Sequence, residues 1–293
     1  RSLLCLQRPI SPLVVQRVLV LGANGQLGKA LRVVFPEATF YGRDECDLNN
    51  PQQIYSLPFS SVDIIINAAA YTAVDVAETA EGKVIAEAIN ARAVELLAQE
   101  ANKHDVTLVH VSTDYVFDGS KNAPYLETDE FKPLSVYAQT KAAGDLAVNV
   151  VPKHYVVRTS WVIGEGNNFV RTMASLAERG IAPSVVNDQI GRLTFTQDLA
   201  EGIKHLLAVK APFGTYNLTN EGPQTSWADI AVKVFELTGH EPDKVTGVYT
   251  AEYFAGKEGI APRPLWSMLD LSKIEAIGFT PENWETRLAE YLA

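Results

Sequence analysis

Short apolar runs alternate with longer amphipathic stretches through the first half of this 293-residue chain. The runs lie at residues 17–22, 62–66, 106–111 and 155–158. They are too short for helices and are apolar nearly throughout, which is typical of parallel strands covered on both faces. The stretches between them repeat apolar residues at helical spacing. This alternation predicts an α/β fold, a Rossmann-like doubly wound parallel sheet.

Helices are predicted within several of the stretches, and a late strand is predicted as well. The helices are expected at 29–35, roughly 77–103, 135–149, 169–179, 196–209 and 227–237, and the strand at 216–219. We expect a dinucleotide-binding core over 17–161. A smaller carboxyl-terminal lobe over 162–293 should be mainly substrate-binding, with late strands and helices returning to the core. Residues 1–16 contain two prolines and are interpreted as a linker or the tail of an upstream segment.

A glycine-rich turn follows the first predicted strand and leads into a helix. Its sequence is Gly22-Ala-Asn-Gly25-Gln-Leu-Gly28. Such glycines allow a tight turn, a close approach of pyrophosphate to the backbone, and close packing of helix on strand. The pyrophosphate then lies at the positive end of the helix. Small residues 67–70, after the strand 62–66, leave room for a flat cofactor. The order of these features predicts a dinucleotide site.

The choice between NADPH and NADH depends on the residues that follow the second strand, predicted at 38–41. About 20 residues after the glycine turn, an acid favours NAD and an arginine favours the extra phosphate of NADP. Arg43 and Asp44 stand side by side at this point. Arg43 comes first, so we expect NADPH and leave NADH open.

The candidate catalytic groups are two hydroxyls, a tyrosine and a lysine. Ser112 and Thr113 follow the strand 106–111, and Tyr137 precedes Lys141 by four residues, which places both on one helix face. A nearby ammonium lowers the pKa of a phenol from its usual value of about 10. Tyr137 could then transfer a proton near neutral pH while a strand-end hydroxyl holds a substrate carbonyl.

Spacing alone does not identify this pair. With 11 Tyr and 13 Lys in the chain, chance gives about half of a Tyr-x-x-x-Lys pair, and a second copy exists at Tyr253 and Lys257. That copy follows no glycine turn and no strand that ends in hydroxyls. We therefore predict that Tyr137 and Lys141 are catalytic, and that Tyr253 and Lys257 form a solvated helix pair.

Composition narrows the range of partners. The formal charge is −10, and an acidic surface repels phosphate backbones, so we expect no nucleic-acid partner. No apolar run approaches the roughly 20 residues that span a bilayer, so we expect no membrane segment. Cys5 and Cys46 cannot form a disulfide framework and have no metal-ligand neighbour at usual spacing. We expect a cytoplasmic protein without a metal ion.

The motifs, in their order, resemble the dTDP-4-dehydrorhamnose reductase family of the extended short-chain dehydrogenase/reductase superfamily. The segments that carry the resemblance are 22–28, 67–75, 112–119, 137–141, 158–161, 166–169 and 187–191. The family implies NADPH-dependent reduction of the 4-keto group of dTDP-4-dehydro-L-rhamnose to dTDP-L-rhamnose. That reaction belongs to nucleotide-sugar and cell-envelope polysaccharide biosynthesis.

The resemblance also implies roles for single residues. Tyr137 would protonate the carbonyl oxygen, Lys141 would depress the phenol pKa and hold the nicotinamide ribose, and Thr113 would hydrogen-bond the carbonyl. The implied cofactor contacts are Gly22, Asn24, Gly25, Gln26, Leu27, Arg43, Asp47, Leu48, Ala68, Ala69, Ala70, Ser112, Tyr137 and Lys141. The implied contacts to the dTDP-sugar are Tyr71, Val74, Asp75, Thr113, Asp114, Trp161, Asn168, Phe169, Asn187, Gln189, Arg192 and Arg263.

One departure from the family pattern affects the substrate side. After Gly191 the family usually has one residue and then Pro-Thr, whereas this chain has Arg192-Leu193-Thr194. The loss of proline frees the backbone of this loop. We hypothesise that Arg192 compensates by binding the substrate diphosphate.

Two other functions stay open from the sequence. A sugar-nucleotide 4,6-dehydratase, among the related epimerases and dehydratases, needs an acid pair after the strand-end hydroxyl, but Asp114 is followed by Tyr115. The regulatory subunit of methionine adenosyltransferase shares the fold and the cofactor site and serves as a non-catalytic partner. Fusion to, or association with, the preceding 3,5-epimerase and a homodimer are further expectations.

Overall fold

A six-stranded parallel sheet forms the centre of the computed structural model, which describes residues 16–293. The sheet has the strand order β10-β5-β4-β3-β1-β2 and parallel pairing throughout. Its strands are β1 (Val18–Leu21), β2 (Thr39–Tyr41), β3 (Ile64–Asn67), β4 (Thr107–Thr113), β5 (His154–Thr159) and β10 (Gly214–Asn217). The predicted doubly wound α/β fold is confirmed. The interpretation of residues 1–15 lies outside the described residues.

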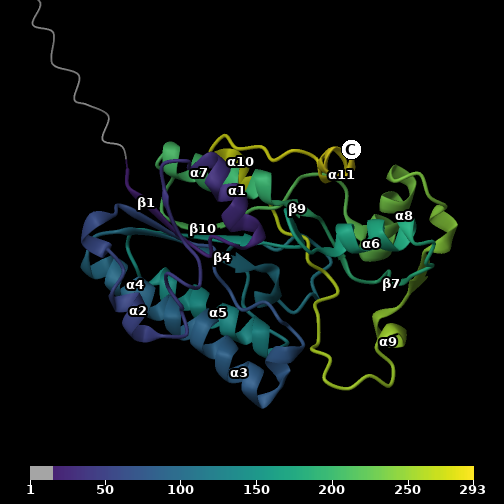
Figure 1. Ribbon diagram of the computed structural model, residues 1–293, viewed down its shortest axis with the longest axis horizontal. Coiled ribbons are helices and arrows are strands. Elements are labelled where there is room, and N and C mark those ends of the chain that lie inside the picture. The colour runs from purple at the N-terminus through teal and green to yellow at the C-terminus, as the bar shows by residue number, and fades with distance from the viewer. Residues whose placement is uncertain (1–15) are drawn as a thin grey trace, which may run out of the picture.

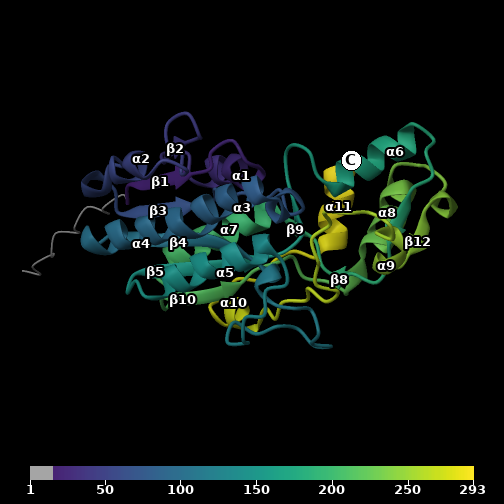
Figure 2. The same ribbon diagram turned by 90° about the horizontal axis from the view of Figure 1, so that it is seen from below.

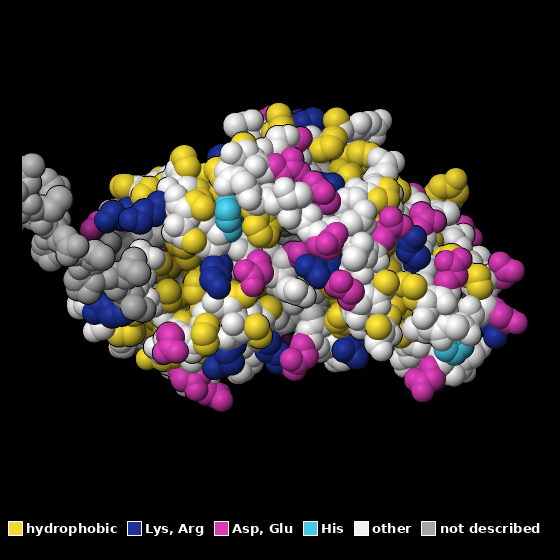
Figure 3. Space-filling model, turned by 90° about the horizontal axis from the view of Figure 1, so that it is seen from above, with side chains coloured by type: hydrophobic (Ala, Val, Ile, Leu, Met, Phe, Trp, Pro, Cys, Tyr) yellow, Lys and Arg dark blue, Asp and Glu magenta, His cyan; other side chains and the backbone are white. Residues whose placement is uncertain are grey.

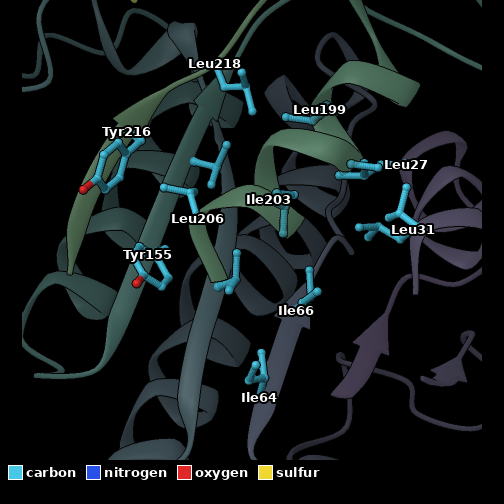
Figure 4. Close-up of a cluster of buried hydrophobic side chains, with 14 of the residues drawn as sticks. Leu27, Leu31, Ile64, Ile66, Tyr155, Leu199, Ile203, Leu206, Tyr216 and Leu218 are labelled. Carbon is cyan, nitrogen blue, oxygen red and sulfur yellow. The ribbon is translucent and has the colours of Figure 1, made fainter. Parts of the chain in front are cut away.

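Helices cover both faces of this sheet (Figures 1 and 2). One face carries α1 (Gln26–Val34) and α7 (Thr196–Ala208), and the other carries α2 (Pro51–Tyr55), α4 (Ala93–Lys103) and α5 (Val136–Asn149). On the first face, Leu27 and Leu31 of α1 and Ile203 of α7 pack over the strands (Figure 4). Strands β2 and β3 lie on opposite sides of β1, so the order in which successive strands are added to the sheet reverses at β1. Such a reversal opens a crevice at the carboxyl ends of the strands.

The long helix expected over 77–103 is interrupted. It consists of a short 3-10 turn, η2 (Val76–Glu78), then α3 (Ala80–Ala86), a π-helical segment η3 (Glu87–Arg92) and α4. Thr79 begins α3 by accepting a hydrogen bond from the Gly82 amide. Asn90, within the π-helical segment, is buried, whereas Val84 in α3 is exposed.

A smaller lobe packs beside the carboxyl ends of the strands (Figure 2). Its helices are α6 (Phe169–Glu178), α8 (Trp227–Leu237), α9 (Thr250–Tyr253) and α11 (Trp284–Leu292). Its strands are β6 (Val162–Ile163), β7 (Ser184–Val186), β8 (Ile190–Gly191), β9 (Thr194–Phe195), β11 (Thr225–Ser226) and β12 (Thr246–Val248). The lobe has its own core, which includes Met173, Val234 and Trp284. By contrast α7, β10 and α10 (Ser272–Ala276) belong to the layers of the main sheet.

The surface shows no segregation of charge on the face drawn in Figure 3. Acidic and basic side chains are intermixed there with scattered hydrophobic ones. Over residues 16–293, no helix combines the length and the apolar character that crossing a membrane requires.

Candidate active site

The glycine turn and the end of β3 line a cavity of about 340 Å³. Gly22 has φ +85°, and a Cβ there would lie 2.6 Å from the Ala69 amide nitrogen. A Cβ on Gly28 would lie 2.1 Å from the Gly22 carbonyl oxygen. Only glycine fits either position, and the small side chains opposite keep the cavity open. These residues fit the pyrophosphate and adenosine half of a dinucleotide.

Most of the implied cofactor contacts line this cavity. They are Gly22, Asn24, Gly25, Arg43, Asp47, Leu48, Ala68, Ala69 and Ala70. The exposed Arg43 guanidinium lies 3.5 Å from the Asp47 carboxylate at the rim. Tyr71, which the resemblance had assigned to the substrate, lines this cavity as well, and Gly42, Cys46 and Ile89 join it without any sequence signal.

A second cavity, of about 620 Å³, shares Gly25, Ala68 and Ala70 with the first. All three proposed catalytic residues, Thr113, Tyr137 and Lys141, line it. Other predicted residues at this cavity are Gln26, Leu27, Val74, Ser112, Asp114, Trp161, Asn168 and Phe169. The shared residues make the two cavities neighbours, so a cofactor in the first can reach the catalytic groups in the second.

Helix α5 places Tyr137 and Lys141 side by side against β4. The helix begins at Ser135, whose hydroxyl accepts a hydrogen bond from the Ala138 amide at 3.2 Å. The Glu78 carboxylate accepts a second one from the Val136 amide at 2.8 Å. These caps fix the first turn of the helix, and hence the height of Tyr137 over the sheet. Tyr137 is 9% exposed and Lys141 is 2% exposed.

The electrostatics of this pair differ from the expectation. Burial raises the pKa of Tyr137 above its usual value, the Asp114 carboxylate raises it further, and the Thr113 hydroxyl opposes the rise. The Lys141 ammonium donates to the Val111 carbonyl at 2.8 Å, and burial lowers the pKa of Lys141 to about 8. The predicted net lowering of the phenol pKa is therefore wrong for this structure, because burial and the Asp114 carboxylate outweigh any effect of the Lys141 ammonium.

Thr113 sits at the end of β4 next to a buried acid. Its hydroxyl donates to the Asp114 carboxylate at 3.1 Å and accepts from the Tyr115 amide at 3.2 Å. Burial raises the pKa of Asp114 to about 6. The Tyr115 ring meets the Tyr137 ring edge-on, with 5.6 Å between centroids. A dehydratase would need a second acid at this point, whereas this chain has the phenol of Tyr115, which packs against Tyr137.

Two tryptophans form the far wall of the second cavity. Trp161 has a positive φ of 48°, and its ring stacks on Trp227 at 3.9 Å between centroids. Gly191 packs against this ring so closely that a Cβ would lie 2.8 Å from it. A bulky residue in the left-handed region is strained, and the stack and Gly191 hold it there. Trp227 begins α8 and was predicted only as part of a helix, and no sequence pattern indicated its place at the cavity.

Asn168 lines the cavity but its amide is already engaged. Its Nδ2 donates to Gln26 Oε1 at 3.2 Å and to the Gly164 carbonyl at 2.9 Å, and its Oδ1 caps α6 by accepting from the Arg171 amide. The residue therefore joins the glycine-turn helix α1 to the smaller lobe. This role places the two sides of the cavity relative to each other.

The whole described chain, residues 16–293, matches the family model described as RmlD substrate binding domain. The chain belongs to this family. A dTDP-4-dehydrorhamnose reductase of Aggregatibacter actinomycetemcomitans is 39% identical over 291 residues, which cover 93% of this chain and 97% of that protein. The resemblance drawn from the motifs is thereby confirmed.

Solved structures of two reductases have the same fold. A dTDP-4-dehydrorhamnose reductase from Clostridium acetobutylicum has a TM-score of 0.87 at 36% identity, covering 94% of this chain and 98% of that one. A second reductase, from Bacillus anthracis and in complex with NADP, has a TM-score of 0.86 at 34% identity, with the same coverages of 94% and 98%.

Within this family member, some implied substrate contacts lie away from the second cavity. The Asn187 side chain packs beside Gly247, and Gln189 Nε2 donates to the Thr250 hydroxyl at 3.1 Å. Arg192 donates to the Leu269 carbonyl at 2.6 Å. The acids nearest to its guanidinium are Glu221, Glu275 and Asp270. The structure therefore contradicts the hypothesis that Arg192 binds the diphosphate, because Arg192 does not line the second cavity and the charged groups near its guanidinium are acids.

Arg263 and Asp75 form an ion pair. The Arg263 guanidinium lies 2.9 Å from the Asp75 carboxylate, and the same carboxylate accepts a hydrogen bond from the Ala261 amide. This pair ties the irregular segment around residue 263 to the loop after β3. Among residues 16–293, no three His, Cys, Asp or Glu side chains gather into a metal-ligand group.

Proposed function

We propose that this chain is an NADPH-dependent dTDP-4-dehydrorhamnose reductase, which reduces the 4-keto group of dTDP-4-dehydro-L-rhamnose to give dTDP-L-rhamnose. The observation that carries the proposal is the meeting of Thr113, Tyr137 and Lys141 at one cavity that continues into the glycine-turn cavity. A relative that is 39% identical is a dTDP-4-dehydrorhamnose reductase by name, and another protein of that name was solved with NADP.

When bound, NADPH supplies the hydride, and the residues of the chain manage the proton and the charge. Tyr137 is protonated at neutral pH, since the ordinary phenol pKa is about 10 and burial raises it further, so the acid that protonates the substrate oxygen is present in its active form. The Thr113 hydroxyl, close to the same phenol, would hydrogen-bond that oxygen while negative charge develops on it. Lys141, charged below about pH 8, supplies the positive charge that stabilises the resulting phenolate and holds the cofactor ribose.

The walls of the second cavity suit a bound sugar nucleotide, and the residues at the cavity favour reduction over the other functions considered. The Trp161 and Trp227 rings give a flat apolar surface, and Val74 and Phe169 extend it. Arg263, which pairs with Asp75 and lies near Tyr115 of this cavity, would attract the diphosphate. Dehydration is disfavoured because Tyr115 occupies the place of a second acid. A regulatory role is disfavoured because the chain keeps all three catalytic side chains at one cavity.

The assembly and location of the enzyme belong to the same proposal. Residues 17–161 would bind the dinucleotide and residues 162–293 mainly the substrate. An epimerase must supply a 4-keto sugar of this type, which supports association with a 3,5-epimerase.

A homodimer is supported by exposed Val84, Leu146 and Val150, which line a groove of about 740 Å³ along α3, α4 and α5. The buried free thiol of Cys46 suits the reducing cytoplasm.

The test is turnover. Purified protein is mixed with NADPH and dTDP-4-dehydro-L-rhamnose, made in place by the preceding enzymes, and NADPH oxidation and dTDP-L-rhamnose formation are measured together. We expect one sugar reduced per NADPH oxidised. Binding of NADPH without any sugar product would refute the proposal and support a regulatory protein.

A further inference from the structure

A closed cluster of polar side chains lies directly behind Lys141. Asp145 follows Lys141 by one turn of α5, and its side chain is fully buried. Arg158 of β5, 2% exposed, donates from Nε to Asp145 Oδ2 at 3.1 Å. The Arg158 guanidinium also donates to the Glu127 carbonyl and lies over the Phe131 ring. The carboxylate is thus held in place by a cation from the neighbouring strand.

The other oxygen of Asp145 faces β4. His110 Nε2 lies 4.0 Å from Asp145 Oδ1, which has no hydrogen-bond partner among the described residues. The proton of His110 can be placed on Nε2: Asn67 Oδ1 accepts from the Ala69 amide, which leaves Asn67 Nδ2 to donate to His110 Nδ1 at 3.2 Å. A chain of contacts therefore runs from Ala69 in the cofactor cavity to Asp145.

Charge balance in this cluster requires an ionised Asp145. A guanidinium is a permanent cation in proteins and, when buried, needs an anion beside it, so Asp145 is ionised although burial raises its pKa. His110 is neutral, since burial and the charge of Lys141 lower its pKa well below the usual value. The cluster therefore contains two cations, Arg158 and Lys141, and one anion, Asp145.

Asp145 also bears on the state of Lys141. Burial lowers the pKa of Lys141, and in the described part of the chain Asp145 is the one carboxylate that raises it. The Val111 carbonyl orients the ammonium but carries no net charge. A neutral lysine could neither stabilise a phenolate nor attract the cofactor's ribose oxygens.

We propose that Asp145 is a positioning residue for the reduction: held by Arg158, it places a fixed negative charge one helical turn behind Lys141 and so keeps that buried lysine charged and correctly placed. This inference rests on the proposed function for its kinetic readout. The titratable and charged groups that face Asp145 are Tyr137 and Lys141 on α5, His110 on β4 and Arg158 on β5.

The test compares the pH profiles of three variants with that of the wild-type chain. Asp145→Asn keeps the shape of the side chain and removes its charge. We expect the basic limb of kcat, near pH 8 in the wild type, to move down by about one to two pH units. At pH 8 this loss is about fivefold or more, and at pH 6 it is small. Asp145→Glu, which restores the carboxylate, should return the limb toward the wild-type position.

The third variant guards against misfolding. Asp145→Asn leaves Arg158 as an uncompensated buried cation, so the double variant Asp145→Asn with Arg158→Met removes both charges and keeps an apolar stem between the aromatic rings. The double variant should fold and keep the shifted limb. Asp105→Asn, a change at an exposed aspartate paired with Lys153, is the matched control and should leave the limb where it is.

The pH dependence of NADPH affinity gives a readout independent of turnover. In the Asp145→Asn variant, NADPH affinity measured by fluorescence should weaken at a lower pH than in the wild type. If the wild type binds NADPH but reduces no sugar, the proposed function fails while the binding curves still test Asp145. If folded Asp145→Asn or the double variant shows the wild-type limb in both kcat and NADPH affinity, the inference is wrong.

Discussion

The chain contains two Tyr-x-x-x-Lys pairs, and their surroundings have almost nothing in common. Tyr137 and Lys141 lie within the 14-residue helix α5, buried against β4. The other pair begins at Tyr253, which is the last residue of the four-residue helix α9. The Tyr253 side chain is 38% exposed. Lys257 lies beyond the helix end, with its Nζ 4.1 Å from the centroid of the Tyr253 ring. The predicted solvated pair is indeed exposed, but its prediction as a helix pair was wrong.

The difference shows that burial gives the first pair its chemistry. At Tyr253 the cation rests on the ring face, where water screens both groups and the contact contributes about 0.5–1 kcal/mol. At Tyr137 and Lys141 the absence of water moves both pKa values, the phenol upward and the ammonium downward. A buried proton donor and a buried positive charge therefore lie close together at only one of the two sites.

The largest effect is expected from Tyr137→Phe, which removes only the phenol oxygen. Loss of the general acid should lower kcat by about 1,000-fold, with little change in NADPH affinity or in melting temperature. The matched control is Tyr253→Phe, measured in the same NADPH oxidation assay. Comparable kcat values for the two variants would remove the distinction between the pairs.

Lys141→Met should follow, with kcat lowered by about 100-fold, because a buried positive charge near the phenolate is lost. KM for NADPH should rise as well, since Lys141 is proposed to hold the ribose. Lys257→Met is the control. A rise in KM without any loss in kcat would show that Lys141 binds the cofactor and does not support the chemistry.

Thr113→Val keeps the shape of the side chain and removes the hydroxyl next to Tyr137. We expect kcat to fall between about 10- and 100-fold, the effect of losing a hydrogen bond to a charged oxygen. The Tyr115 amide also loses its acceptor at 3.2 Å, so the melting temperature should be recorded alongside. A kcat equal to that of the wild type would remove Thr113 from the mechanism.

The pH dependence of the wild-type rate tests, without any mutation, whether the lysine that supports catalysis is buried or exposed. Lys141 is charged below its pKa of about 8 and loses its proton above it. The rate of reduction should therefore be level just below pH 8 and fall up to tenfold per unit above it. Steady-state kcat from pH 6.5 to 10 measures this limb. A rate that held level to pH 10, where an exposed lysine titrates, would place Lys141 in a more polar environment than the structure gives it.

The smallest effect is expected at the second pair. Tyr253→Phe and Lys257→Met should each change kcat and KM by less than about twofold, because neither residue lines the two cavities of the active site. The same kinetic assay applies. A loss of tenfold or more in either variant would show that the segment around α9 reaches the substrate.

The sequence predicts the main sheet well because its signals are local. The apolar runs and Gly22, Gly25 and Gly28 each obey steric rules that need no distant partner. The π-helical segment at Glu87–Arg92 was missed because no local pattern marks an extra residue inside a regular helix. The two-residue strands of the lobe were missed for a related reason, since their pairing partners, as in β8 with β11, are far apart in the chain.

The catalytic residues were found from context, whereas parts of the site were not. Trp227 lines the cavity together with Trp161, which has a positive φ and stacks on it, and no sequence spacing reveals this contact. Arg192 was expected to bind the substrate, but its guanidinium donates to the Leu269 carbonyl. This contact depends on the tertiary fold and has no local sequence signal. Asp145 has no sequence signal beyond its place one turn after Lys141. Its burial and its contact with Arg158 come from packing between α5 and β5.

The most direct test of the account compares Tyr137→Phe and Tyr253→Phe in one assay, with NADPH and dTDP-4-dehydro-L-rhamnose. NADPH affinity is measured by fluorescence in parallel. We predict that both variants bind NADPH as the wild type does, that Tyr253→Phe turns over normally, and that Tyr137→Phe loses about 1,000-fold in kcat. Equal turnover by Tyr137→Phe and the wild type would contradict the assignment of Tyr137 as the proton donor.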